Sequence, residues 1–170
     1  MLETKDLILR KAVQEDWRGM YYNLWCHSES AKYMLWNVTT SEEDAVARME
    51  RTRAFQATHD HHWLVIEKSS GQAIGFAGLE VTEPDVCSET GVALGPAFVG
   101  KGYGKQILNA LTEYARDQLG AKKFKACCRE QNVASKKLQI SCGFYYTHSE
   151  PKTDPRDGSD YVMEYYEKEI

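Results

Sequence analysis

Apolar positions along this chain recur with two different periods, which predict helices and strands in alternation. Apolar residues three or four positions apart predict amphipathic helices, and short apolar runs that end at turn residues predict strands. The expected helices cover residues 16–25, 41–55, the stretch from the glycine-rich segment 100–104 to 119, and 132–141. The expected strands cover residues 7–10, 63–66, 73–79, 89–94, 123–128, 144–148 and 161–166.

The order of these elements indicates a mixed α/β (α+β) fold. It runs β, α, α, β, β, β, α, β, α, β, β, with an antiparallel front half and a β-α-β crossover at the back. Ser41 and the acidic residues after it predict a helix start, and Gly120 predicts the end of the longest apolar stripe. We expect residues 151–159 to form a polar loop, and residues 1–170 to form a single domain.

Composition narrows the function without defining it. The 170 residues include 21 basic and 25 acidic side chains, so the formal net charge is −4, and the pI near 5.8 argues against a general nucleic-acid binder. No stretch approaches the roughly 20 apolar residues of a membrane span, and the first residues are polar, so we expect a cytoplasmic protein. The five cysteines lack framework spacing and predict free thiols. His59, His61 and His62 lack partnering ligands, so we expect no metal site.

A glycine-rich segment joins the strand 89–94 to the helix after it. Gly100, Gly102 and Gly104 lie where backbone N–H groups and the positive end of the helix dipole could face an anion. A P-loop would need Ser or Thr in place of Gly102, and a dinucleotide-binding turn would need Gly or Ala in place of Lys105. Both nucleotide interpretations are therefore weak, and a turn without a ligand stays open beside an anion site.

Three segments carry a more specific pattern. Residues 99–104 read Val-Gly-Lys-Gly-Tyr-Gly, and residues 132–144 begin as N-x-x-S and end in Gly-Phe. Residues 2–10 read Leu-Glu-Thr-Lys-Asp-Leu-Ile-Leu-Arg. The first two resemble motif A, [QR]-x-x-G-x-[GA], and motif B of the GNAT superfamily of acetyl-CoA-dependent N-acetyltransferases. The third resembles the start of its ribosomal-protein N-terminal acetyltransferase (RimJ/RimL-like) branch. Together the motifs extend the resemblance over about residues 2–166.

The resemblance implies the GNAT fold, a mixed and mostly antiparallel sheet of about seven strands with helices on both faces. It implies a cleft where the fourth strand, 89–94, splays from the fifth, 123–128. The pantetheine arm of acetyl-CoA would enter this cleft like an added strand, along the backbone of Val92, Ala93 and Leu94. The N–H near Leu94 is then a candidate donor to the thioester oxygen.

The resemblance also places the remaining cofactor contacts. Backbone amides of residues 100–104 would bind the pyrophosphate without a metal, with Lys105 nearby, and Asn132 and Ser135 would face the far end of the arm. Val99 departs from the pattern, because the family usually has Gln or Arg there, whose side chain contributes to these contacts. The expected cofactor-binding residues are Val92, Ala93, Leu94, Val99, Gly100, Lys101, Gly102, Tyr103, Gly104, Lys105, Asn132 and Ser135.

The implied chemistry is attack of a neutral amine on the thioester carbon. Free amines have pKa values of about 8 to 10, so a base or a water relay helps. Glu89 is the candidate base, with a solvated strand-end carboxylate as the alternative. Many family members use a motif B tyrosine as the acid, where this chain has Gln139. Ser135 is the candidate replacement, and Tyr145, Tyr146 or water are alternatives.

The implied function is transfer of the acetyl group of acetyl-CoA to a primary amine by direct attack in a ternary complex. The acceptor would be a peptide or protein N-terminus or a small-molecule amine. Trp36, between the first two helices, is the candidate substrate residue, through a cation–π contact. Val99 and Gln139 leave open a non-catalytic acyl-CoA-binding sensor. We expect no nucleic-acid or membrane partner, and either a monomer or a homodimer.

Overall fold

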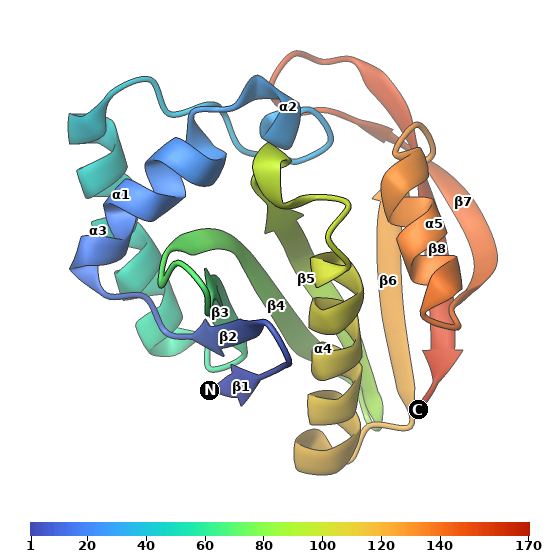
Figure 1. The fold of residues 1–170 in the computed structure, drawn as a ribbon. Helices are drawn as coiled ribbons and strands as arrows, with labels where there is room; N and C mark the ends of the chain where they lie inside the picture. Colours follow the sequence, from blue (N-terminus) through green and yellow to red (C-terminus); the bar gives the residue numbers. More distant parts are fainter.

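One eight-stranded sheet organises the structure, a computed structural model that describes residues 1–170 (Figure 1). Its strands are β1 (Leu2–Glu3), β2 (Leu7–Arg10), β3 (His62–Glu67), β4 (Ala73–Glu83), β5 (Val86–Leu94), β6 (Lys123–Arg129), β7 (Tyr145–Thr153) and β8 (Asp160–Glu169). They lie in the order β1-β2-β3-β4-β5-β6-β8-β7, and only β5 and β6 run parallel. The expected mixed, mostly antiparallel fold is confirmed.

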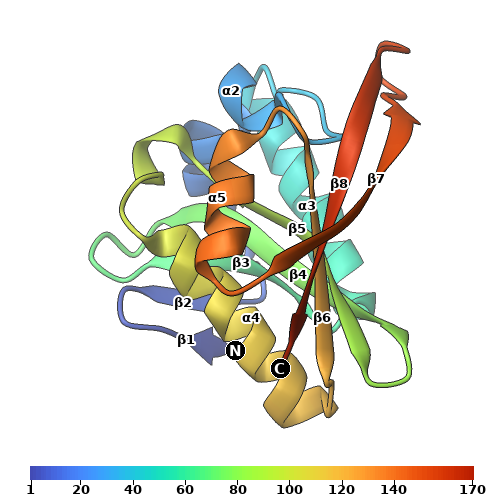
Figure 2. The ribbon, with the colours of Figure 1, turned by 90° about the vertical axis from the view of Figure 1, so that its right-hand side faces the viewer.

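Helices cover both faces of this sheet (Figure 2). The α-helices are α1 (Trp17–Met20), α2 (Ser28–Ala31), α3 (Glu42–Thr58), α4 (Tyr103–Leu119) and α5 (Val133–Ser141). One core cluster joins the sheet to α4 through Ile107, Leu108 and Leu111, and a second joins it to α1 and α3 through Met20 and Met49. None of the helices combines the length and apolar character needed to cross a bilayer.

The sequence signals that predict α3 and α4 are confirmed. The Ser41 hydroxyl accepts the amide of Asp44 at 3.1 Å and caps α3. Gly120 ends α4 in the left-handed conformation, at φ 69°. The apolar stripe of α4 is buried against the sheet, as its spacing predicts.

The helix expected over residues 16–25 is present, but it is irregular because this segment follows the sheet surface. It forms a 3-10 turn (Gln14–Asp16), then α1, then a π-helical turn (Tyr21–Trp25). A Cβ at Gly19 would lie 2.9 Å from the carbonyl oxygen of Ala73, so glycine permits the close approach of α1 to β4. The Asn23 amide donates to that carbonyl at 2.9 Å and holds the π-helical turn there.

Four strand boundaries also differ from the expected ones, among them the end of β8, which runs to Glu169 rather than to residue 166. β4 extends to Glu83 and β5 begins at Val86 rather than at residue 89, because the hairpin closes tightly with Asp85 at φ 61°. β7 runs on to Thr153, which pairs with the start of β8, so the expected loop 151–159 shrinks to 154–159. Most of β7 is exposed, so neither of its faces shows an apolar period that the sequence could reveal.

The sheet splits where β5 and β6 part. Their parallel pairing covers only Val86–Ser88 against Lys123–Lys125. Beyond it, β6 pairs only with β8, and residues 89–94 of β5 pair only with β4. The expected splay between these two strands is therefore present, and it opens at Glu89.

Candidate active site

The turn before α4 presents a row of free backbone amides. Gly100 and Gly102 have φ values of +78° and +79°, and no protein atom lies within 4 Å of a Cβ built at either. Beyond Phe98, the first amide with a backbone acceptor is Gln106, which donates to Gly102 at 3.2 Å. The amides of residues 99–105 therefore point to no partner in the protein. Such a turn at a helix N-terminus fits a diphosphate.

The side chains of this turn do not all act as the motif implies. A Cβ at Gly104 would lie 2.9 Å from Leu138 of α5, so glycine at this position lets α4 and α5 pack closely together. The Tyr103 hydroxyl donates to Glu67 at 2.8 Å, and the Lys101 ammonium lies 3.7 Å from the same carboxylate. Hydrogen bonds from Ser70 and Tyr103 hold the pKa of Glu67 below its ordinary value.

Two further side chains of the turn are exposed. Val99 is 61% exposed, so an apolar side chain stands in solvent where the motif usually has Gln or Arg. Lys105 is exposed near the first turn of α4, with no anionic partner in the protein. Lys105 is consequently the one lysine of this turn free to meet a phosphate.

The edge of β5 that faces the splay is open. Val92, Ala93 and Leu94 pair with β4 on one side, opposite Ala77, Phe76 and Gly75, and with no strand on the other. An open strand edge carries backbone donors and acceptors that can pair with an extended amide-containing arm. The structure thus brings these three predicted residues to the cleft and leaves their second edge available.

Glu89 is the first residue of β5 beyond the parallel pairing. Its side chain is half-buried, and burial raises the pKa of its carboxyl to about 7, against the opposing effect of the Val92 amide. A freely solvated strand-end carboxylate, the alternative, would keep its ordinary pKa. A carboxylate with a pKa near neutrality is suited to accept a proton.

Two thiols of β6 flank the cleft. Burial raises the pKa of Cys127 to about 12, with a further contribution from the nearby Glu89 charge. Burial likewise raises the pKa of Cys128 to about 11. Both stay protonated near neutral pH, and a protonated thiol is a poor nucleophile. Cys142 is buried in the core. The arrangement therefore favours direct transfer over an acyl-thiol intermediate on these residues.

The start of α5 has a role that the motif does not state. The Asn132 side chain accepts the amide of Ser135 at 3.2 Å and caps the helix. The N-x-x-S spacing is itself a capping signal that could have indicated this. The Ser135 hydroxyl accepts a 3.4 Å hydrogen bond from Gln139, whose amide also donates to the Cys127 carbonyl at 3.2 Å. Gln139 Oε1 is buried without a partner.

A cavity of about 460 Å³ lies against α3, on the face of the sheet opposite the one that α4 covers. It is lined by Trp36 and by Thr90, which follows Glu89 directly, and the Thr90 hydroxyl lies 2.9 Å from His62 Nε2. Arg48, which the sequence analysis missed, also lines it, with its guanidinium carbon 4.7 Å from the Trp36 ring. A protein cation therefore already occupies a face of the ring expected to contact the amine.

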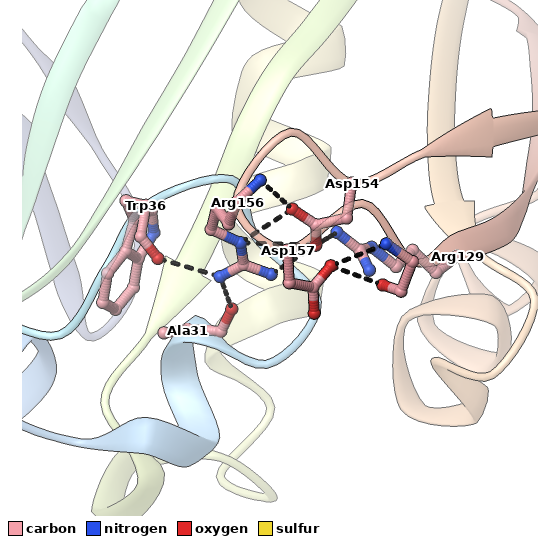
Figure 3. Close-up of polar contacts among 7 residues, drawn as sticks. Ala31, Trp36, Arg129, Asp154, Arg156 and Asp157 are labelled. Carbon is pink, nitrogen blue, oxygen red and sulfur yellow. Dashed lines mark hydrogen bonds and ion pairs between the residues drawn. The ribbon is translucent and has the colours of Figure 1, made fainter.

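A buried ion cluster holds the loop that carries Trp36 (Figure 3). Asp154, 1% exposed, accepts from Arg129 and Arg156 at 2.7 Å each. Arg156 also donates to the carbonyls of Ala31 and Trp36 at 3.0 Å each. The two arginines hold the pKa of Asp154 well below its usual range, so it stays ionised. Nothing local in the sequence signals this cluster.

The three clustered histidines have separate partners. His59 Nδ1 lies 2.8 Å from the Phe55 carbonyl, and His61 Nδ1 lies 3.2 Å from the Tyr114 hydroxyl. The structure contains no group of three or more His, Cys, Asp or Glu side chains that could together hold a metal ion.

Comparison with known proteins identifies relatives of this arrangement. Residues 6–145 match the family model described as "Acetyltransferase (GNAT) domain". The uncharacterized N-acetyltransferase YnaD of Bacillus subtilis (strain 168) is 26% identical over 165 residues, which span 97% of this chain and 94% of that protein.

Solved structures share the fold. The microcin C7 self-immunity acetyltransferase MccE, in complex with acetyl-CoA and AMP, superposes with a TM-score of 0.80 at 19% identity, over 98% of this chain and 94% of that one. RimL, a ribosomal L7/L12 alpha-N-protein acetyltransferase in complex with coenzyme A, gives 0.79 at 18% identity, over 98% and 96%. At these identities the likeness concerns the fold alone.

Proposed function

This chain belongs to the acetyltransferase (GNAT) domain family, and we propose that it transfers the acetyl group of acetyl-CoA to a primary amine by direct attack in a ternary complex. One observation carries the proposal: Glu89, with its pKa near 7, lies where β5 and β6 part, on the strand whose open edge leads to the free amides before α4 and next to Thr90, which lines the cavity. We assign the activity to one domain spanning residues 1–170.

The residues present fit acetyl-CoA, which supplies the activated acetyl thioester. We assign the pyrophosphate to the amides of residues 99–105, because they have no acceptor in the protein, and Lys105 adds an unpaired positive charge. We assign the pantetheine arm to the open edge of Val92–Leu94. Asn132 contributes by capping α5, which places Ser135 over β6.

On this proposal the acceptor amine approaches from the cavity beside Thr90. Glu89 accepts its proton, directly or through a water, so that the amine attacks in its neutral form. The Leu94 amide is the proposed donor to the thioester oxygen, which gains negative charge as the amine adds. Because Gln139 cannot act as an acid, Ser135 is the proposed donor of the proton that the leaving thiolate takes up.

The choice of acceptor is a finer proposal. Membership of the ribosomal-protein N-terminal acetyltransferase branch is a proposal that the resemblance of residues 2–10 supports. A peptide N-terminus and a small-molecule amine both fit the proposed reaction, and Trp36 is the proposed acceptor contact from the sequence. The charged residues that line the cavity bear on which acceptor molecules it can bind.

Release of free thiol from acetyl-CoA, followed against pH with a panel of amines and peptides, tests the function. We expect kcat/KM of the wild type to rise as pH increases through about 7, because Glu89 must lose its proton to act as a base. Glu89→Gln should lower kcat by about 100-fold and remove this rise. Glu80→Gln, a carboxylate that lines the same cavity, is the control and should leave the profile in place.

Two other outcomes would contradict the proposal. If ATP raises the melting temperature and acetyl-CoA leaves it unchanged, the turn before α4 binds a nucleotide instead. If acetyl-CoA raises the melting temperature but no amine releases thiol, the chain is the acyl-CoA-binding sensor that Val99 and Gln139 leave open.

A further inference from the structure

Arg48 places a positive charge in the acceptor cavity without an acidic partner. Its guanidinium carbon lies 4.5 Å from the Trp25 ring and 4.7 Å from the Trp36 ring. Its Nη1 donates to the Thr39 hydroxyl at 2.9 Å and to the Asn37 carbonyl at 3.4 Å. No carboxylate oxygen lies within 4.0 Å of it, although the residue is half-buried.

The other arginines that are partly or fully buried each have an acidic partner. Arg10, Arg129 and Arg156 each pair with an aspartate at 2.7 Å. Burial, with the neighbouring Arg51, instead lowers the pKa of Arg48 to about 10, which still leaves it charged at neutral pH. A buried charge normally needs a partner of opposite sign. In this protein that partner is missing at one position, and that position lines a cavity.

The Arg48 guanidinium also has donors to spare. Its hydrogen bonds within the protein, to Thr39 and Asn37, both come from Nη1, so Nε and Nη2 donate to no protein acceptor. An anionic group in the cavity could accept from these free donors. The planar fork of a guanidinium matches the paired oxygens of a carboxylate or a phosphate.

The cavity that Arg48 lines also reaches β5 beside the proposed base. Arg48 on α3 and Thr90 on β5, the residue after Glu89, both line it, as does one carboxylate, that of Glu80. Its volume of about 460 Å³ suits a small molecule or the end of a peptide. We propose that Arg48 binds an anionic group of the acceptor, so that the acetylated amine belongs to a molecule that also carries a carboxylate or a phosphate. This inference rests on the proposed function, because it concerns the acceptor of that reaction.

Matched acceptors that differ only in charge test the inference. The series glycine, β-alanine and 4-aminobutanoate, each against its carboxamide, varies the span between amine and anion. Phosphoethanolamine against ethanolamine tests a phosphate, and tetrapeptide amides that begin Ser-Asp or Ser-Asn test a peptide source. We expect the wild type to prefer at least one anionic member by about tenfold or more in kcat/KM, as charged hydrogen bonds typically give.

Three variants identify Arg48 as the cause. Arg48→Gln should remove the preference for the anion while acetylation of the neutral member continues. Arg48→Lys, which keeps the charge but loses the planar fork, should retain part of the preference. Arg53→Gln is the matched control, since it changes an exposed arginine of α3 that does not line the cavity and should leave the preference intact. A purely structural Arg48 would instead lower the rates with both members of each pair equally.

A binding measurement keeps this inference separate from the function. Calorimetry with CoA-loaded protein measures the affinity for each anionic acceptor and its neutral counterpart without turnover. If no amine releases thiol, the proposed function fails, and binding of the anion that is lost in Arg48→Gln still supports the site. The inference is overturned if the wild type shows no preference for any anionic member in either assay, or if Arg48→Gln keeps the preference unchanged.

Discussion

At the residue scale, Gly102 meets two requirements that other residue types would not: a left-handed backbone conformation and open space beside the free amides. Its φ of +79° lies in the left-handed region, and it starts α4 with the amides that follow it free. A Cβ there would meet no protein atom within 4 Å, so it would stand in the open space beside the amides to which we assign the pyrophosphate. The requirement for glycine is therefore a matter of backbone conformation and of ligand access.

We expect Gly102→Ala to weaken acetyl-CoA binding more than it weakens the fold. The left-handed conformation should cost alanine about 1 kcal/mol of unfolding free energy. The added methyl group should raise the Kd for acetyl-CoA by about tenfold, by holding the phosphates away from the amides. Urea unfolding and calorimetry measure the two effects.

Gly120→Ala is the matched control at the other end of the same helix. Its φ of +69° imposes a similar strain, and a Cβ there is equally free of contacts. We expect the same loss of stability with an unchanged Kd. Equal loss of acetyl-CoA affinity in both variants would show that the turn before α4 has no special role in binding.

At the scale of elements, the sequence predicts those parts whose pattern reflects their own burial. α3 and α4 show helical spacing and end signals, and β3 is an apolar run buried among other strands. The segment around α1 and the ribbon of β7 and β8 were predicted less well. The 3-10 and π-helical turns beside α1 depend on contact with the sheet, and the length of β7 depends on pairing along exposed strands. Neither kind of contact changes the apolar period of the sequence.

The same limit applies to the candidate site. The turn at residues 99–104 and Glu89 could be found from the sequence, because motif and strand end lie close together along the chain. Arg48 and the Asp154 cluster could not, since their importance depends on distant partners. Arg156, for example, donates to the carbonyl of Ala31, 125 positions away. Local spacing holds no information about such contacts.

Gly95 joins two elements that the sequence treats as separate. A Cβ at this residue would lie 1.9 Å from the carbonyl oxygen of Asn23, so the π-helical turn can rest against the end of β5 only if glycine stands there. We expect Gly95→Ala to lower the unfolding free energy by about 3 kcal/mol, because backbone rather than a flexible side chain must move. Urea unfolding measures this. Gly71→Ala, where no atom lies within 4 Å, should cost about 1 kcal/mol from strain alone.

At the scale of the whole molecule, two contacts lie at the two ends of the splay between β5 and β6. At one end β5 and β6 pair over three residues each. At the other end Arg129 of β6, Asp154 and Arg156 connect the β7–β8 side to the loop of Ala31 and Trp36 (Figure 3). The ion cluster thus fixes the position of Trp36 relative to the cleft.

Arg156→Lys tests whether this cluster positions the acceptor side. The lysine can keep an ion pair with Asp154 but cannot also donate to the carbonyls of Ala31 and Trp36. We expect the KM for the acceptor to rise by about threefold to tenfold from the lost hydrogen bonds, with the KM for acetyl-CoA unchanged. Arg116→Lys, an exposed arginine paired with Asp117 on α4, should change neither constant.

The effect of pH distinguishes this cluster from the Glu89 base. The pKa of Asp154 is held below its ordinary value, so its ion pairs contribute stability above the unfolded pKa of about 4 and lose it only as pH falls towards the folded value. The change in KM in Arg156→Lys should therefore be constant from about pH 6 to pH 8, while the Glu89-dependent rise in rate occurs within that window. If the ratio of the variant's KM to the wild-type KM instead changed with the titration of Glu89, Arg156 would take part in the proton-transfer step.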